Sequence, residues 1–176
     1  VEALHGRINV DWTPGNGTTF TLTLPLALTS SHGLLVRVSD QVLAIPLSAI
    51  ERITAVAPQE VVSLEGYDTV RSNGRPLTLV RLSDILDSPR ANTQQDDAPV
   101  PVVILSAAER HIAFAVDELV GEQEMVMKGL GRQLKRVGGI AGATVMGSGE
   151  VVLILNAVDL IRLATRGERR SVFESS

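Results

Sequence analysis

The chain contains the same pair of β-strand patterns twice. Residues 41–50 read QVLAIPLSAI and residues 110–119 read RHIAFAVDEL, so an aliphatic residue, an alanine and a second large apolar residue recur in one order. A second motif follows each copy: residues 74–86 read GRPLTLVRLSDIL and residues 149–161 read GEVVLILNAVDLI. Two motifs in the same order, about 70 residues apart, predict two related small β units in tandem.

Composition narrows the function classes. The 176 residues allow one domain or two small ones, and with 44% hydrophobic but only 3% aromatic residues the core must consist of Val, Leu, Ile and Ala. The net charge of −4 and the scattered basic residues argue against a nucleic-acid surface. The absence of cysteine excludes disulfides and thiolate metal sites and is compatible with a reducing cytoplasm. No apolar run approaches the roughly 18–20 residues of a membrane helix, so we expect a cytoplasmic protein without membrane insertion.

The first residues resemble the end of a different domain. Residues 7–12 and 18–24 alternate as strands on either side of the turn sequence PGNG at 14–17. A lone two-stranded hairpin is marginally stable, so this segment implies a larger sheet upstream and a chain that is a fragment.

The rest of the chain reads as short strands with few helical segments. The connection at 87–101 is polar and contains proline, and we expect it to be mobile. We expect strands at 34–38, 42–46, 53–64 (a strand pair), 77–81, 102–105, 112–116, 118–127 and 151–155. We expect helical segments at 48–52, 83–86 and 157–165.

Several motifs resemble known families. The sequence GNGTTFTLTLPL at 15–26 resembles the last nucleotide-binding box of the ATP-binding domains of GHKL-type histidine kinases. Residues 33–164 resemble the CheW-like regulatory domain, with Thr78 where a proline is common and Asn156 where an aspartate is usual. The matching motifs are IPL with IE at 45–51, GRPLTLVRLSDIL at 74–86, GEQEMVMKGLG at 121–131 and GGIAGATVMGSGEVVLIL at 138–155.

This order of motifs resembles the C-terminal part of the chemotaxis histidine kinases of the CheA family. The resemblance implies an all-β fold of two tandem SH3-like barrels, preceded by a β-hairpin remnant of an α/β kinase ATP-binding domain. The implied domains are the remnant at 1–28, a CheW-like regulatory domain at 33–165 with barrel units at about 33–86 and 102–161, and a tail at 166–176.

Gly15, Gly17 and Thr18 are the candidate cofactor-binding residues. Backbone N–H groups of a glycine-rich turn can bind phosphate, and the resemblance implies that Thr18 helps to recognise adenine. The other nucleotide boxes are absent from the sequence, so in this fragment a tight hairpin turn is the alternative. We therefore expect ATP and magnesium to bind only in the intact parent kinase, with no cofactor and no catalytic residue in the fragment.

Other polar groups have a structural interpretation beside a chemical one. The acidic cluster is either a metal or acid/base site or a solvated strand face with salt bridges. The histidines lie near turns rather than on a helix suited to phosphotransfer, and the basic run is a phosphate patch or a solvated loop. These residues are Asp117, Glu118, Glu122 and Glu124; His5, His32 and His111; and Lys128, Arg132, Lys135 and Arg136.

The candidate partner-binding residues are mainly apolar. Two small barrels cannot bury every aliphatic side chain, and those at barrel ends would form a patch that marks an interaction site. The alternative is that they are core, and that Glu51, which resembles a family position near the receptor contact, is an ordinary surface residue. The candidates are Ile45, Leu47, Glu51, Ile53, Leu79 and Val80.

The sequence therefore favours a regulatory docking module. The resemblance implies that one barrel face binds a CheW-type adaptor and that the groove between barrels binds the cytoplasmic tip of a chemoreceptor at membrane-associated arrays. A short joint at 27–33 would connect these contacts to the parent kinase domain. The alternatives are a free-standing CheW-like adaptor and a fragment of an ATP-dependent kinase with its own nucleotide binding.

Overall fold

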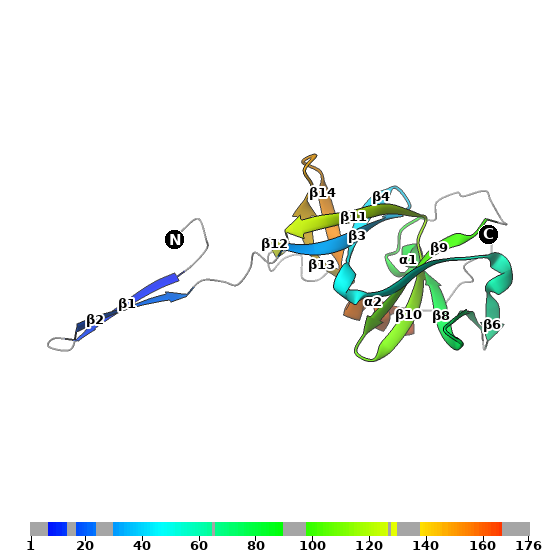
Figure 1. Ribbon diagram of the computed structural model, residues 1–176, viewed down its shortest axis with the longest axis horizontal. Helices are drawn as coiled ribbons and strands as arrows, with labels where there is room; N and C mark the ends of the chain where they lie inside the picture. The colour runs from blue at the N-terminus through cyan, green and yellow to red at the C-terminus, as the bar shows by residue number, and fades with distance from the viewer. Residues whose placement is uncertain are drawn as a thin grey trace.

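The computed structural model describes residues 7–13, 17–23, 30–64, 66–89, 98–126, 128–129 and 138–166 (Figure 1). The described strands form one two-stranded sheet and two six-stranded sheets, which confirms the predicted all-β class. The strands are β1 (Arg7–Thr13), β2 (Gly17–Thr23), β3 (Ser30–Val38), β4 (Gln41–Pro46), β5 (Ile50–Val56), β6 (Val62–Leu64), β7 (Tyr67–Ser72), β8 (Arg75–Arg81), β9 (Val100–Ala107), β10 (Arg110–Ala115), β11 (Glu118–Val126), β12 (Lys128–Gly129), β13 (Ile140–Val145) and β14 (Val151–Leu155).

Four short helical segments complete the described elements. They are the 3₁₀ turns η2 (Leu47–Ala49) and η3 (Pro58–Glu60), the single-turn α1 (Leu82–Ile85) and α2 (Ala157–Arg166). Asn156 directly precedes helix α2, and its Oδ1 accepts a hydrogen bond from the Asp159 N–H at 3.2 Å. Asparagine and aspartate are equally good N-caps, which explains why either residue suits this position.

The two large sheets have the same arrangement. The first sheet has the order β11-β3-β4-β14-β13-β12, and the second sheet has the order β5-β9-β10-β8-β7-β6. In each, an antiparallel hairpin, β3–β4 or β9–β10, is followed by a parallel neighbour, β14 or β8. Ala44 pairs with Ile154 in the first sheet and Ala113 pairs with Leu79 in the second, so the repeated alanines occupy equivalent positions.

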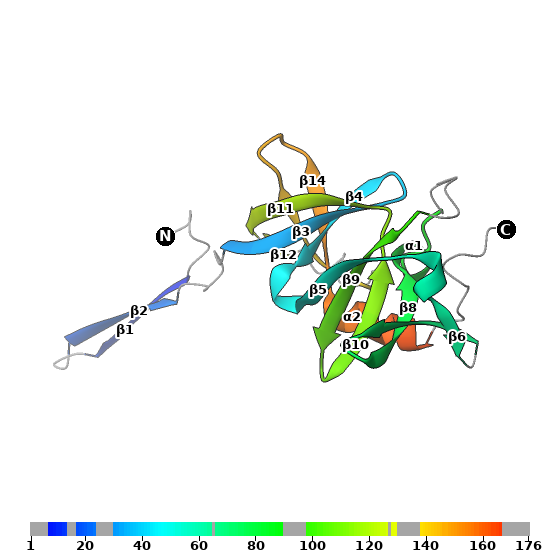
Figure 2. The same cartoon turned by 45° about the vertical axis from the view of Figure 1, so that its right-hand side comes forward.

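Each sheet takes strands from both sequence units. The first sheet combines β3–β4 with β11–β14, and the second combines β9–β10 with β5–β8. This differs from the expected boundaries of about 33–86 and 102–161, which would give each unit its own barrel. The reason is two crossings: η2 leads from β4 to β5, which pairs with β9, and Asp117 leads from β10 to β11, which pairs with β3. Figure 2 shows β5 beside β9 and β11 beside β3.

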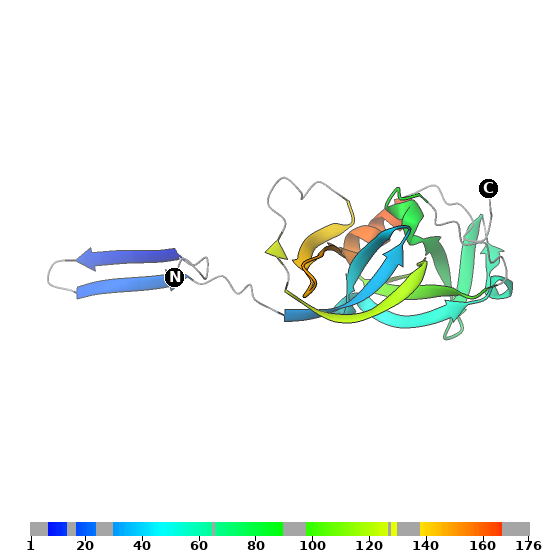
Figure 3. The same ribbon diagram turned by 90° about the horizontal axis from the view of Figure 1, so that it is seen from above.

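The central hairpin strands are buried on both faces. One face of each hairpin points to a central core between the two sheets, where α2 also packs (Figure 3). The other face of each hairpin packs in a separate apolar cluster on the far side of its own sheet from the central core. We call this cluster the interior of that sheet. The central core comprises Leu34, Val36, Val38, Leu43, Ile45, Val80, Leu82, Val103, Leu105, Ile112, Phe114, Val116, Leu155, Leu160, Ile161 and Ala164.

The alternation of side chains explains the repeated pattern. In β4, Leu43 and Ile45 enter the central core and Ala44 faces the interior of the first sheet. In β10, Ile112 and Phe114 enter the central core, and the alanine between them faces the interior of the second sheet. Successive strand residues point to opposite faces. The large–Ala–large pattern therefore places two large side chains in the central core and the alanine between them in the interior of the sheet.

Candidate protein-docking site

Three of the predicted partner-binding residues lie in the core. Ile45 is 0% exposed, Leu79 is 3% exposed and Val80 is 6% exposed. Ile45 and Val80 pack in the central core, and Leu79 packs in the interior of the second sheet. Strands β4 and β8 have neighbours on both edges and apolar layers on both faces, so these side chains do not form part of a surface patch.

The other three lie at or near the surface, along the crossing from the first sheet to the second. Leu47 in η2 is half-buried against the central core. Glu51 is exposed and contacts His111, with 2.5 Å between Oε2 and Nδ1. Ile53 lies on the edge strand β5 and is 42% exposed. Leu47, Glu51 and Ile53 therefore lie at or near the surface along one segment of the chain, unlike the three buried residues.

A pocket opens beside this crossing, between β5 and the β6–β7 hairpin. It has a volume of about 530 Å³, and we call it the β5–β7 pocket. β5 and β6 are the two ends of the second sheet, so the sheet curls until both ends face one cavity. The lining residues are Arg52, Thr54, Ala55, Val56, Glu60, Val62, Leu64, Thr69, Val70, Arg71, Ser72, Asn73, Gly74, Pro76 and Ile104.

The pocket has an apolar floor and exposed apolar walls. Val56, Val70 and Ile104 are buried members of the second sheet's interior. Val62 and Leu64, both on β6, are 53% and 50% exposed. Side chains of this kind at a concave edge are typical of a contact with another protein.

The charged residues around the pocket are not balanced. Arg52 and Arg71 are exposed lining residues. Glu60 also lines the pocket, but its Oε2 accepts a hydrogen bond from the Ala57 N–H at 2.8 Å. The carboxylate caps η3 but keeps its negative charge, so the two guanidinium groups leave the charged lining with a net positive charge.

Val62, Leu64 and Arg71 were not predicted from the sequence as partner-binding residues. The alternation of Val62 and Leu64 is visible in the sequence, but β6 is a three-residue strand outside the repeated motifs. Only the curling of the second sheet places it opposite β5.

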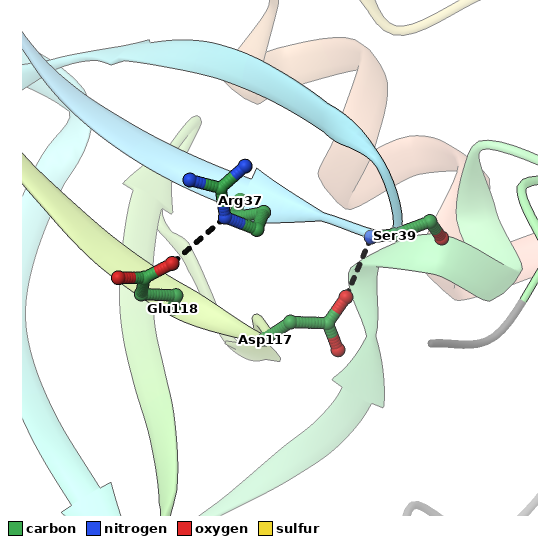
Figure 4. Close-up of polar contacts among 4 residues, drawn as sticks. All are labelled: Arg37, Ser39, Asp117 and Glu118. Atoms are coloured by element: carbon green, nitrogen blue, oxygen red, sulfur yellow. Dashed lines mark hydrogen bonds and ion pairs between the residues drawn. The ribbon is translucent and has the colours of Figure 1, made fainter. Parts of the chain in front are cut away.

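Two members of the acidic cluster stabilise a crossing instead of forming a metal site. The Ser39 N–H donates to Asp117 Oδ2 at 2.6 Å, and Asp117 Oδ1 lies 3.9 Å from Arg81 Nη1. Arg37 Nε donates to Glu118 at 2.7 Å, and this hydrogen bond raises the pKa of the Arg37 guanidinium (Figure 4). Among the described residues there is no group of three or more His, Asp or Glu side chains placed to bind a metal ion.

The remaining members of the cluster and the histidines are surface groups. Glu122 and Glu124 are exposed on β11, and His32 is exposed on β3. His111 is also exposed and contacts Glu51. His5, and the basic run apart from Lys128, lie outside the described residues.

The nucleotide box is described only in its backbone and only in part. Gly17 and Thr18 begin β2 and pair with Thr13 and Trp12 of β1. Gly15 lies outside the described residues. In the part of the chain that the structure describes, no helix is both long and apolar enough to cross a bilayer.

Comparison with known proteins identifies the family. The model of the CheW-like domain matches residues 32–165. The sensor histidine kinase CheAY of Helicobacter pylori is 38% identical over 164 residues, which cover 93% of this chain and 20% of that protein. The chemotaxis protein CheA of Bacillus subtilis is 30% identical, with 92% of this chain and 24% of that protein covered. The gliding motility regulatory protein of Myxococcus xanthus is 34% identical, with 96% and 22% covered.

A solved structure shows the same fold. The scaffolding protein TtCheW of Thermoanaerobacter tengcongensis superimposes with a TM-score of 0.56 at 7% identity, over 73% of this chain and 90% of that chain. The chain spans between a fifth and a quarter of the length of the three kinase and motility relatives. From the family match and these relatives, the chain belongs to the CheW-like domain family and corresponds to the CheW-like region of CheA-type histidine kinases.

Proposed function

We propose that this chain is the regulatory docking module of a chemotaxis-type sensor histidine kinase. It binds a CheW-type adaptor and the cytoplasmic tips of chemoreceptors, and it couples both to the activity of the kinase domain. The supporting observation is the coincidence of a CheW-like domain over 32–165 with an exposed apolar edge at Ile53, Val62 and Leu64.

The adaptor binds at the β5–β7 pocket in this proposal. An adaptor of the same fold presents similar sheet edges, so the contact brings the edge of one sheet against another. Apolar side chains with a charged rim exclude water at the centre and give moderate affinity without a large interface. Such a contact forms and dissociates readily, which suits a signalling array.

The receptor tip binds at the crossing between the sheets. Leu47 and Ile53 offer apolar surface there, and Glu51 supplies a charge beside them. A helical tip can place an apolar stripe against such a surface in the manner of a helix bound in a groove.

Catalysis belongs to the parent kinase in this account. Gly15, Gly17 and Thr18 contribute to the ATP and magnesium site only when the rest of the kinase domain is present. The module itself is not an enzyme: it transmits a change of position to the kinase domain through the joint at 27–33. We place the protein in the cytoplasm, at receptor arrays beneath the membrane.

Charge substitutions at exposed apolar positions test the docking surface. Each substitution places a carboxylate in an apolar contact: Ile53→Asp should weaken binding of a receptor tip and Val62→Asp binding of a CheW-type adaptor. We expect each affinity to fall about tenfold, equivalent to roughly 1.4 kcal/mol. Isothermal titration calorimetry measures the change.

Val158→Asp is the matched control for this test. Val158 is 55% exposed, like Val62 at 53%, but lies on α2 away from the pocket lining. If Ile53→Asp and Val62→Asp bind both partners as tightly as the unchanged chain, the proposed surface is wrong.

A free-standing CheW-like adaptor is the second candidate, because the fold matches that of a scaffolding CheW protein. An antibody raised against this chain distinguishes the two candidates on an immunoblot of cells that naturally produce the protein. The kinase proposal predicts a band several times the mass of this chain. A band at about the mass of the chain alone would favour the adaptor.

A further inference from the structure

One pair of equivalent interior positions is filled differently in the two sheets. β11 pairs with β3 as β5 pairs with β9: Gln123 faces Gly33 in the first sheet, and Thr54 faces Val102 in the second. Two residues further along the edge strand, Met125 in the first sheet occupies the place of Val56 in the second. The interior pair is therefore Met125 with Gly33 in one sheet and Val56 with Val102 in the other.

Methionine and glycine fill the interior of the first sheet together. Met125 is 1% exposed and packs with Leu35, Ala44 and Ile154. A Cβ at Gly33 would lie only 2.2 Å from Met125 Cε and 2.6 Å from its Sδ. The long side chain thus lies in space that only a glycine leaves free.

Two valines occupy the equivalent positions in the second sheet. Val56 is shorter than methionine, and Val102 occupies the position that is glycine in the other sheet. Val56 and Ile104 form the floor of the β5–β7 pocket of about 530 Å³. Since a closely packed interior seldom leaves space of this size, this sheet has a cavity that opens to the surface between its two ends.

We propose that the β5–β7 pocket binds a single apolar side chain that a partner protein presents on an acidic segment. The inference rests on the docking function proposed above and names the chemistry of the partner at this site. The pocket lies in the size range of small-ligand sites, so it can accept a leucine-sized or phenylalanine-sized group. Its floor is formed by the apolar side chains of Val56, Val70 and Ile104, with threonine, serine and asparagine side chains elsewhere in the lining.

The charge at the pocket selects the flanking residues of the partner. Arg52 and Arg71 are exposed lining residues, and Glu60, which accepts a hydrogen bond from the Ala57 N–H, offsets one of their two positive charges. Carboxylates on either side of the inserted side chain can approach both guanidinium groups, which are good partners for carboxylates. A basic flanking segment would be repelled, so specificity comes from the rim and affinity from the inserted side chain.

Three short peptides test this chemistry directly. The first is N-acetyl-Glu-Asp-Leu-Asp-Glu-amide, the second has alanine in place of its leucine, and the third has lysine in place of its four acids. Each is titrated into the 176-residue chain while backbone amide resonances are recorded. We expect the first peptide to shift the resonances of Val70, Arg71 and Ile104. The alanine peptide should bind about tenfold more weakly because of the lost apolar contact, and the lysine peptide about fivefold or more weakly because of the charge.

Variants of the chain locate the binding. Val56→Met lengthens a side chain of the pocket floor and should occupy part of the pocket, which would reduce binding of the leucine peptide about tenfold. Arg52→Glu with Arg71→Glu tests the rim without altering the interior. Arg110→Glu, at an exposed arginine of the same sheet that does not line the pocket, is the matched control.

The outcomes separate this inference from the docking function. The inference is supported if the leucine peptide is preferred and both Val56→Met and the double arginine variant weaken it while Arg110→Glu does not. It is overturned if the three peptides bind alike, if none binds, or if the pocket variants change nothing. An adaptor that binds the unchanged chain and both pocket variants equally would overturn the inference and leave the docking function standing. Peptide binding without any adaptor or receptor binding would refute the docking function alone.

Discussion

At the residue scale, single positions decide how the strands pack. Gly33 is buried because Met125 occupies the space beside it, and Asp117 connects the β3–β4 turn to Arg81 of the second sheet. Neither role is visible in the sequence, where the glycine looks like part of a polar hinge and the aspartate like part of an acidic face. Both depend on contacts between residues far apart in the chain.

Gly33→Ala should destabilise the domain by about 1–3 kcal/mol, because the new methyl group must displace a buried methionine. Urea unfolding followed by circular dichroism measures the free energy. Met125→Val alone costs packing. In the double variant, the loss in the free energy of unfolding should be closer to that of Gly33→Ala than to the sum of the two single losses. Strict additivity of the two changes would contradict the proposed contact.

Asp117→Ala should cost about 2 kcal/mol in the free energy of unfolding, because it leaves the Ser39 N–H without its carboxylate and removes a half-buried ion pair. Glu118→Ala is the comparison. Glu118 pairs with Arg37 at the surface, so its loss should change stability by less than about 1 kcal/mol. Equal effects of the two substitutions would show that the crossing at Asp117 is not specially stabilised.

At the element scale, the alternation of a strand identifies its faces but not what covers them. Ile45 and Val80 were candidates for a docking patch, and the structure buries both in the central core. A continuous apolar run such as VLAI at 42–45 is itself typical of a strand buried on both faces, whereas a strand with one free face alternates between apolar and polar residues. Ile53 is exposed because β5 ends the second sheet, and strand order cannot be derived from residue spacing.

Helix α2 offers a test of local structure. Asn156→Ala removes the acceptor for the Asp159 N–H and should cost about 1 kcal/mol. Asn156→Asp restores the residue usual in the family and should leave stability unchanged or slightly higher. Thermal unfolding of the three chains compares them, and a loss for Asn156→Asp as large as that for Asn156→Ala would contradict the capping role.

At the scale of the whole molecule, the duplicated sequence builds two sheets that exchange strands. The motifs at 41–50 and 110–119 identified the central hairpin strands, and the motifs at 74–86 and 149–161 identified their parallel neighbours. The pattern predicted two β units but not the exchange, because a repeat shows which strands are alike and not which strands pair. The pocket likewise depends on the curling of the second sheet.

The strand exchange predicts that neither half folds alone. The polypeptides 30–89 and 98–166 each lack strands that the other supplies, so each should show little strand signal in circular dichroism. Mixed in equal amounts, they should recover a cooperative unfolding transition. A stable fold in either separate half would contradict the exchanged topology.

We propose that this chain acts by binding partner proteins and not by binding nucleotide. Parallel calorimetric titrations of the 176-residue chain with a CheW-type adaptor and with ATP plus magnesium compare the two activities in one experiment. We expect saturable micromolar binding of the adaptor and no saturable heat from ATP. Micromolar ATP binding together with no detectable adaptor binding would contradict it.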